Sequence, residues 1–366
     1  MKLTFEKSDL VESTNIVLKA VSTKTTMPIL TCILIEASGD EIKMTGNDME
    51  LSIETKTKGS VIEEGSIAVE AKLFSEIIRK LPDGQVELEE KDEIIRISCG
   101  KAHFNIPARS ASDFTKMPNI ETKEYICISE FTLKEAIRQT IFSISQNDTN
   151  KIMSGELFEI NGDNLKVVSL DGHRISIRNI KLRESYEPRK VIVPGKTLLE
   201  ISRIIEGDAE KDIFIFFSDK YIIFEYGTTV ILSRLIEGEY FKVDKMISND
   251  YETLVNINRK EFIDAIDRSL LLVRETDKKP IVFDINEQGM AISMSTVIGS
   301  MKESIDAAKE GKDIKIGFNP KFLADALRAI DDEEVSIYMV NAKSPCFIRD
   351  AENTYIYLIL PINFVA

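Results

Sequence analysis

The chain has 366 residues, which is too long for one ordinary hydrophobic core, so we expect two or three domains. Hydrophobic residues make up 43% and charged residues 30%, so the chain should fold, whereas its formal net charge of -14 argues, taken alone, against nucleic acid as a partner. No segment resembles a signal peptide or is long and apolar enough to span a membrane, which predicts a cytosolic protein.

The first predicted elements come from a repeat of domain size. Apolar-x-apolar triplets begin at Leu3, Ile126 and Val255, and each has another apolar residue seven places after its start. This spacing predicts a short strand that runs into an amphipathic helix. The starts are 123 and 129 residues apart, so the repeated unit has the size of a domain.

A second set of strand and helix signals lies between the first. Its triplets begin at Ile67, Val191 and Ile316, and each has a lysine five places after its start, near the beginning of the next helix. Together the two sets predict helices over residues 8–20, 72–80, 132–142, 196–205, 259–271 and 320–330.

The segments between these helices alternate like antiparallel strands, with Gly, Asp and Asn at the turns. The sequence therefore predicts an α+β protein with three similar domains, each with two helices packed on antiparallel sheets. We place the domains at 1–120, 121–247 and 248–366, with boundaries in the polar stretches "SASDFTKMPNIETKE" and "MISNDYET".

Charge is segregated between the predicted helices and the rest of the chain. The six helix ranges carry a net charge of +4, which leaves -18 on the remainder. Ordinary solvent-exposed helix faces would explain this distribution of charge about as well. Six equivalent helices on a common side, however, would form a weakly basic surface that attracts phosphate backbone without reading bases.

Motifs for catalysis or cofactor binding are missing or incomplete. The stretch "PGKT" at 194–197 resembles the end of a phosphate-binding loop, but Lys190 stands where that loop needs its first glycine. The four cysteines lie far apart, without zinc or paired-thiol spacing, and are expected to be buried and reduced. We expect no cofactor, no metal and no catalytic residue.

The stretch "SLDGHRIS" at 169–176 places an acid, a glycine, a histidine and an arginine in succession, at Asp171, Gly172, His173 and Arg174. One interpretation is a hydrolase that uses His173 and Asp171. The other is a strand-turn-strand junction in which Asp171 and Gly172 form the turn and the next two residues bond locally. We favour the junction, because a catalytic histidine needs a nucleophile or metal and an orienting partner, and the sequence indicates none.

Several motifs together resemble the bacterial DNA polymerase III beta subunit, or beta sliding clamp, over the whole chain. They are "TMPIL" at 26–30, "TGNDMEL" at 45–51, "DGHR" at 171–174, "VIVPGK" at 191–196, "IGFNPKFL" at 316–323 and "YLILPI" at 357–362. The resemblance implies the DNA-clamp fold, with each chain forming half of a closed ring.

What the resemblance implies for function is a non-catalytic processivity factor. A head-to-tail homodimer would encircle double-stranded DNA without sequence specificity and slide along it. It would tether the replicative polymerase, the clamp loader and other replication or repair proteins through short peptides. Its expected place is the bacterial cytoplasm, in association with the nucleoid.

The resemblance also implies three sets of site residues. The peptide pocket would be lined by Met153, Leu170, Gly172, His173, Arg174, Ile175, Phe241, Met246, Phe322, Leu358, Leu360, Pro361 and Ile362. The DNA-facing residues would be Lys24, Lys72, Asn147, Lys151 and Lys196. The dimer interface would include Phe104, Ile106, Leu271 and Leu272.

The chain departs from the family pattern at one of these pocket residues and at a position beside the pocket residues. The family commonly has Pro where this chain has Phe241, and Arg where it has Asn363, so the peptide preference of the pocket stays open. A monomeric peptide-binding adaptor of the same fold is a further alternative to the clamp.

Overall fold

The computed structural model describes residues 1–22, 24–116, 118, 120, 124–145, 150–274 and 279–364. Within these ranges it forms two compact units. The first contains 1–131 and 203–235, and the second contains 132–202 and 236–366. None of the described helices is long and apolar enough to cross a membrane.

Six α-helices in the described ranges match the predicted helices to within a few residues. They are α1 (Lys7–Val17), α2 (Ala71–Lys80), α3 (Glu130–Thr140), α4 (Gly195–Ile204), α5 (Arg259–Leu270) and α6 (Pro320–Ala329). Polar side chains fix several of their starts: Glu70 accepts hydrogen bonds from the first N–H groups of α2, and Asn258 and Asn319 do the same for α5 and α6.

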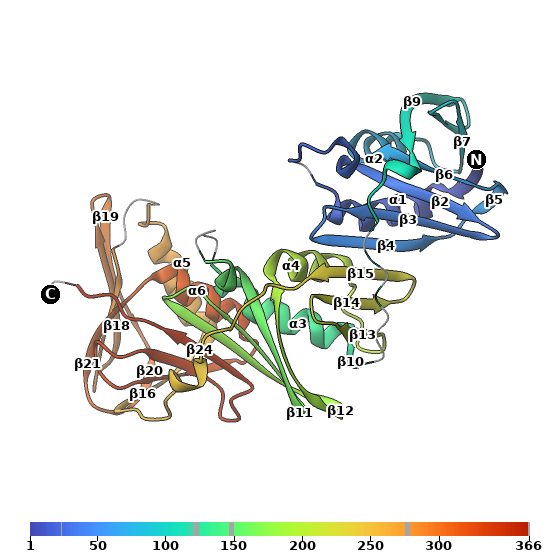
Figure 1. The fold of residues 1–366 in the computed structure, drawn as a ribbon. Helices are drawn as coiled ribbons and strands as arrows, with labels where there is room; N and C mark the ends of the chain where they lie inside the picture. Colours follow the sequence, from blue (N-terminus) through green and yellow to red (C-terminus); the bar gives the residue numbers. More distant parts are fainter. Residues whose placement is uncertain are drawn as a thin grey trace. The chain divides into compact units, whose positions relative to one another are not determined.

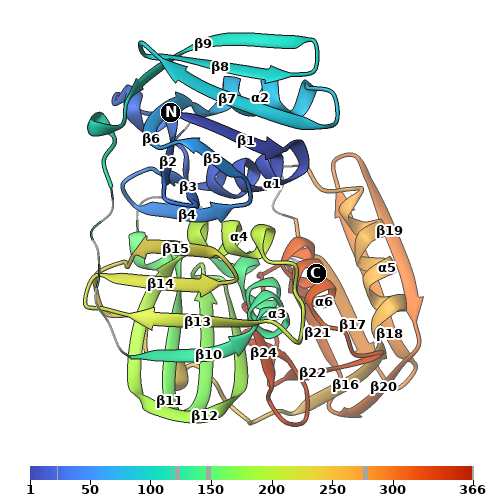
Figure 2. The same cartoon turned by 90° about the vertical axis from the view of Figure 1, so that its right-hand side faces the viewer.

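The first unit is built on one continuous sheet of 13 strands. In spatial order they are β10 (Tyr125–Ser129), β13 (Asp212–Phe217), β14 (Tyr221–Tyr226), β15 (Thr229–Arg234), β4 (Leu51–Thr57), β3 (Glu41–Asn47), β2 (Cys32–Ser38), β6 (Gly65–Glu70), β9 (Ala102–Ser110), β8 (Ile94–Cys99), β7 (Gln85–Lys91), β1 (Lys2–Glu6) and β5 (Ser60–Glu63). Figure 2 shows β10, β13, β14 and β15 side by side in that order, and α1 and α2 pack against each other.

The second unit contains two sheets. The larger has seven strands in the order β11 (Gly155–Leu170), β12 (Arg174–Pro194), β24 (Tyr355–Ile359), β23 (Cys346–Arg349), β22 (Glu334–Met339), β16 (Thr253–Asn258) and β20 (Ala307–Gly311). The smaller has four, in the order β19 (Gly299–Ile305), β18 (Gly289–Thr296), β17 (Ile281–Asn286) and β21 (Ile314–Phe318). The long pair of β11 and β12 is visible in Figure 1.

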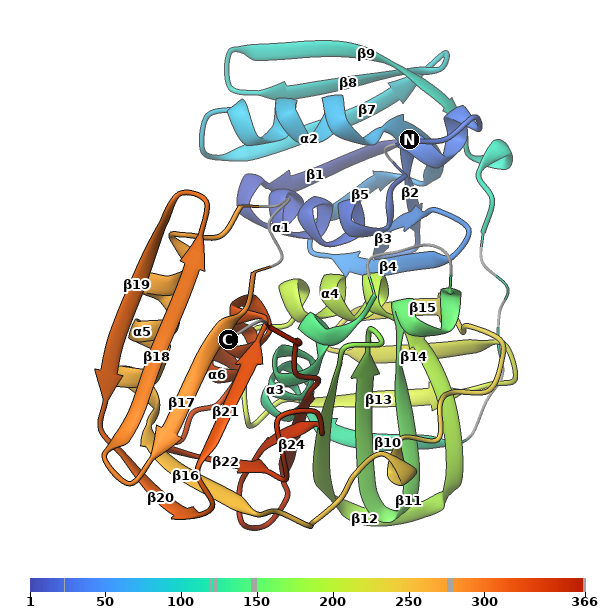
Figure 3. The ribbon, with the colours of Figure 1, turned by 90° about the vertical axis from the view of Figure 1, so that its left-hand side faces the viewer.

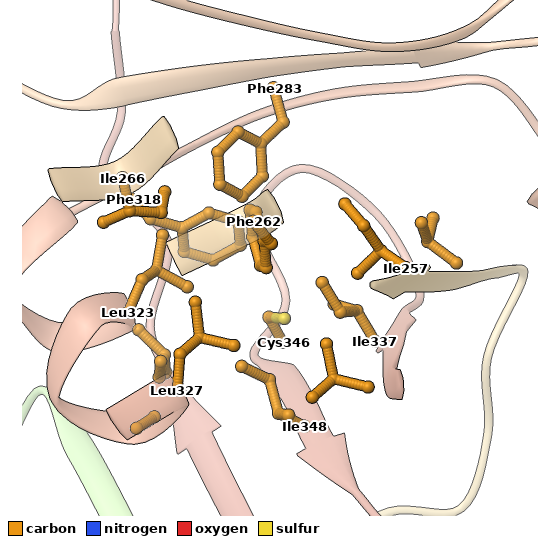
Figure 4. Close-up of a cluster of buried hydrophobic side chains, with 14 of the residues drawn as sticks. Ile257, Phe262, Ile266, Phe283, Phe318, Leu323, Leu327, Ile337, Cys346 and Ile348 are labelled. Atoms are coloured by element: carbon orange, nitrogen blue, oxygen red, sulfur yellow. The ribbon is translucent and has the colours of Figure 1, made fainter. Parts of the chain in front are cut away.

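The core of the second unit lies between its helices α5 and α6 and both sheets. Figure 4 shows Phe262 and Ile266 of α5 and Leu323 of α6 packed with Phe283 and Phe318, and all five side chains are fully buried or nearly so. Each buried Leu, Ile or Phe stabilises the fold by roughly 1.5–3 kcal/mol relative to an exposed position. The apolar residues that defined the repeat therefore form the core.

Strand pairing explains why the compact units differ from the three sequence repeats. In the first unit, β15 from the middle of the chain pairs with β4 near its start, from Thr229 opposite Thr55 to Ser233 opposite Leu51. In the second unit, β12 pairs with β24 near the C-terminal end of the chain. The middle of the chain thus contributes strands to both units, and the predicted domain boundaries stay a prediction.

The four cysteines are free, and three of them are buried as predicted. Cys32, Cys99 and Cys346 are buried and Cys127 is half-buried. Burial raises the pKa of the Cys346 thiol above its ordinary range, which keeps this thiol protonated and unreactive.

Candidate peptide-binding site

The loop between β11 and β12 is a tight turn fixed by one carboxylate. Oδ1 of Asp171 accepts hydrogen bonds from the backbone N–H of His173 at 3.0 Å and of Arg174 at 3.2 Å. Gly172 has a φ of 87°, in the left-handed region that favours glycine. The predicted strand-turn-strand junction is therefore confirmed, with β11 ending at Leu170 and β12 beginning at Arg174.

Arg174 is the buried centre of this loop, with only 8% of its surface exposed. Its Nε donates to Oδ2 of Asp171 at 3.0 Å and its Nη1 to Oδ2 of Asp325 on α6 at 2.7 Å. Its Nη2 donates to the carbonyl oxygen of Phe142, and the guanidinium lies 4.3 Å from the ring centroid of Phe322. These contacts hold the guanidinium within the chain, although Arg174 also belongs to the lining of the pocket beside the loop.

His173 is the exposed polar group of the loop. Its imidazole stacks on the ring of Phe322, with 6.2 Å between ring centroids. The Asp171 carboxylate is directed to backbone N–H groups and to Arg174, so it does not orient the imidazole. This arrangement removes the acid-base pair on which the hydrolase interpretation depended.

A pocket of about 440 Å³ opens beside this loop, within the second unit. Its walls are largely apolar, and the loop supplies the polar edge. It is lined by Met153, Leu170, Gly172, His173, Arg174, Ile175, Phe241, Met246, Pro345, Leu358 and Leu360. The structure thus brings together most of the residues predicted for peptide binding.

Three of the predicted residues lie beside the pocket and not in its lining. Phe322 lies under the loop, against His173 and Arg174. Pro361 and Ile362 are half-buried and follow Leu360 along the chain. Pro345 is the lining residue that the sequence analysis missed, because its position depends on the pairing of β23 with β24, which no local pattern predicts.

Buried polar groups support the strands that carry the loop. The Ser143 and Ser176 hydroxyls lie 2.6 Å apart, and the Ser169 hydroxyl donates to the Thr140 carbonyl at 2.5 Å. Glu156 nearby in β11 is fully buried, and burial raises its pKa well above the usual range. A protonated carboxyl at this position avoids the cost of a buried unpaired charge.

The predicted DNA-facing lysines are exposed. Lys24 and Lys72 belong to the first unit, with Lys72 in the first turn of α2. Lys151 and Lys196 belong to the second, at the start of a short 3-10 helix (Lys151–Ser154) and of α4. Asn147 lies outside the described residues.

The predicted interface residues differ in exposure. Phe104 on β9 is 40% exposed and Leu271, just after α5, is 78% exposed. Leu272 is half-buried beside Gly299 of β19, whereas Ile106 is only 7% exposed and packs inside the first unit. Val297 and Ile298, in the turn between β18 and β19, were not among the predicted interface residues, but they are exposed apolar side chains of the kind that marks a binding surface.

Comparisons with known proteins agree with this geometry. Three family models, the DNA polymerase III beta subunit N-terminal, central and C-terminal domains, match residues 1–118, 127–242 and 244–363. The chain belongs to the DNA polymerase III beta subunit family. The predicted family resemblance and the three-domain clamp fold are confirmed.

Individual relatives cover the full length of the chain. The beta sliding clamp of Bacillus subtilis is 36% identical, covering 99% of this chain and 100% of the relative, and that of Staphylococcus epidermidis is 34% identical, covering 99% of each. The crystal structure of the Bacillus subtilis sliding clamp superimposes with a TM-score of 0.96 at 35% identity, over 100% of both chains. A DNA polymerase III beta subunit structure from Eubacterium rectale matches with a TM-score of 0.96 at 57% identity, over 100% of this chain and 99% of that one.

Among the described side chains, no group of three or more His, Cys, Asp and Glu residues could hold a metal ion. The pocket is instead suited to apolar side chains, with a few polar groups at its edge.

Proposed function

We propose that this protein is the processivity factor of a bacterial DNA polymerase. It encircles duplex DNA as a homodimeric ring and holds partner proteins through the pocket beside the β11–β12 loop. The observation that carries the proposal is the full-length match to sliding clamps, combined with an apolar pocket at the loop where the resemblance places peptide binding.

The chemistry of the pocket supports a short apolar peptide as its ligand. Met246 is 48% exposed and Leu360 is 37% exposed, so large apolar surface is available for a partner's side chains. His173 is exposed at the edge and can hydrogen-bond a peptide carbonyl. We expect apolar side chains of the peptide to fill the pocket and a few polar contacts to orient it. Such binding suits partner proteins that replace one another on the same pocket.

Two strand edges support ring closure by a second copy. Among the described strands, β19 pairs only with β18, and residues 102–107 of β9 pair only with β8. Exposed apolar side chains accompany both edges: Phe104 is on β9, and Leu271, Val297 and Ile298 are near β19. Such edges favour pairing with another chain. If β9 of each copy meets β19 of the other, two equal joints close a ring.

The exposed lysines support contact with phosphates. In a chain with a net charge of -14, a ring would retain DNA by encirclement, assisted by weak, base-independent contacts. Asp171 accepts hydrogen bonds from the backbone of its own loop, and the His173 ring stacks on Phe322. Both arrangements support a non-catalytic role for the loop.

Retention on circular DNA tests the proposal. Purified protein is loaded on nicked circular DNA by a clamp loader, and the DNA is then linearised. We expect the protein to stay on the circle and to leave the linear molecule by sliding off its ends. Equal retention on both forms would contradict encirclement, and a particle of 41.4 kDa in light scattering would favour the monomeric adaptor.

A further inference from the structure

The last described residues connect the peptide pocket to the four-stranded sheet. Leu360 lines the pocket, and its backbone N–H donates to the carbonyl oxygen of His173 at 2.9 Å. Two residues later, the N–H of Ile362 donates to the carbonyl oxygen of Gly317 on β21 at 2.8 Å. Figure 3 shows this segment leaving β24 and ending near β21.

Gly317 allows the segment to lie unusually close to the sheet. A Cβ at this position would stand 2.7 Å from Cδ1 of Phe364 and 3.0 Å from the carbonyl oxygen of Ile362. Such distances are shorter than van der Waals contact, so a larger residue at 317 would displace both groups. The Phe364 ring therefore occupies the space that a side chain at 317 would take.

The contact between Phe364 and Gly317 lies away from the pocket. Phe364 lines a separate groove of about 410 Å³ with Val282 and Lys315 of the small sheet. The next residue of β21, Phe318, is fully buried in the core, whereas Phe364 is only half-buried. Phe364 is thus anchored on the sheet surface and contributes nothing directly to the pocket lining.

We propose that Phe364 is a positioning residue for peptide binding: its contact with Gly317 fixes residues 360–364, so that Leu360 stands as a pocket wall before a peptide arrives. The inference rests on the proposed function and adds a residue outside the pocket to it. Among the described residues, the segment is otherwise held by two backbone hydrogen bonds, at positions 360 and 362. Without the anchor, binding must order the segment, and that entropy cost weakens affinity.

The experiment is a double-mutant cycle in the full-length protein. A fluorescent peptide bearing Gln, Leu and Phe is titrated into wild type, Phe364→Ala, Gly317→Ala and the double variant. We expect each single change to weaken binding by about tenfold, as for loss of a preorganised wall. The double variant should be no weaker than either single variant, because both changes remove the same contact.

The conservative variant Phe364→Leu is the matched control and should keep most of the affinity, since it retains an apolar anchor. Dimer mass and the urea midpoint should not change in either Phe364 variant, because the ring lies outside the core.

The outcomes separate the inference from the proposed function. If wild type does not bind the peptide, the peptide-binding part of the proposed function fails. If wild type binds and Phe364→Ala binds equally well, or if the two single losses multiply in the double variant, the positioning role is wrong. Should Gly317→Ala lower the urea midpoint, the comparison of Phe364→Ala with Phe364→Leu decides, because neither adds atoms to β21.

Discussion

The peptide pocket and the two open strand edges are both proposed binding regions, but they differ in how far one chain has organised them. At the pocket, Arg174 is buried and joined to Asp171, Asp325 and Phe142 before any partner binds. At the edges, Phe104 and Leu271 are exposed. From this difference we expect that the pocket recognises a ligand by its preformed shape, whereas the edges gain their order from a second copy.

The largest expected effect is at the edges. Changing Leu271→Ala together with Leu272→Ala should weaken dimerisation by about 4 kcal/mol or more, roughly a thousandfold, because each truncation removes apolar surface from the joint. Light scattering across a dilution series measures it. Ile106→Ala is the contrasting variant: since Ile106 is buried in one chain, we expect a lower urea midpoint for unfolding. An unchanged dimer at low concentration would remove Leu271 and Leu272 from the interface.

The second effect is at the centre of the pocket loop. Arg174→Ala should lower the free energy of unfolding by about 3 kcal/mol, since it leaves the carboxylates of Asp171 and Asp325 without their cation. Urea unfolding measures this, and peptide titration should show a parallel loss of affinity. Full stability in Arg174→Ala would mean that the loop is held by Asp171 and the backbone alone.

The buried carboxyl of Glu156 in β11 gives a pH-dependent test. Because the pKa of Glu156 is raised in the folded state, its contribution to stability is present below the unfolded pKa and is lost as the pH rises toward the folded pKa. Wild type should lose up to about 1.4 kcal/mol per pH unit from this group in that window. Glu156→Gln should remove this part of the slope, as urea midpoints from pH 5 to pH 8 would reveal. Equal slopes in both proteins would show that Glu156 is not the source.

A smaller effect is expected at the edge of the pocket. His173→Ala should weaken peptide binding by about 1–2 kcal/mol, the range for one hydrogen bond at a partly buried site, and should leave stability unchanged because the side chain is exposed. Calorimetric titration provides the measurement.

Deleting residues 360–366 removes the wall of the pocket that Leu360 forms, so the deletion should abolish peptide binding while the dimer persists. If both variants bind as wild type does, the loop is an ordinary turn.

The smallest effect is at the exposed lysines. Replacing Lys24, Lys72 or Lys151 with Ala should weaken DNA binding slightly and equally for all sequences, and each change should lower the salt slope by about one unit. Affinity measured at several salt concentrations on two unrelated duplexes tests this. A loss that depends on the bases would contradict sliding.

Local patterns in the sequence predicted most of the fold. The apolar spacing predicted the six described helices, and Asp171-Gly172 predicted the turn, because both signals lie within a few residues. The role of Arg174 could not be predicted, since its partner Asp325 is 151 residues away. For the same reason the pairing of β15 with β4, which places part of the middle of the chain in the first unit, could not be predicted from the repeats.

That pairing also has a consequence for the order in which the protein can fold during synthesis. The hydroxyls of Thr55 and Thr229 lie 2.8 Å apart across β4 and β15, yet 174 residues separate them. One edge of β4 must therefore wait until nearly two thirds of the chain has left the ribosome, which favours slow folding. An unpaired edge in a partly made chain is exposed to other nascent chains, so we expect chaperones to be needed at this stage rather than after release.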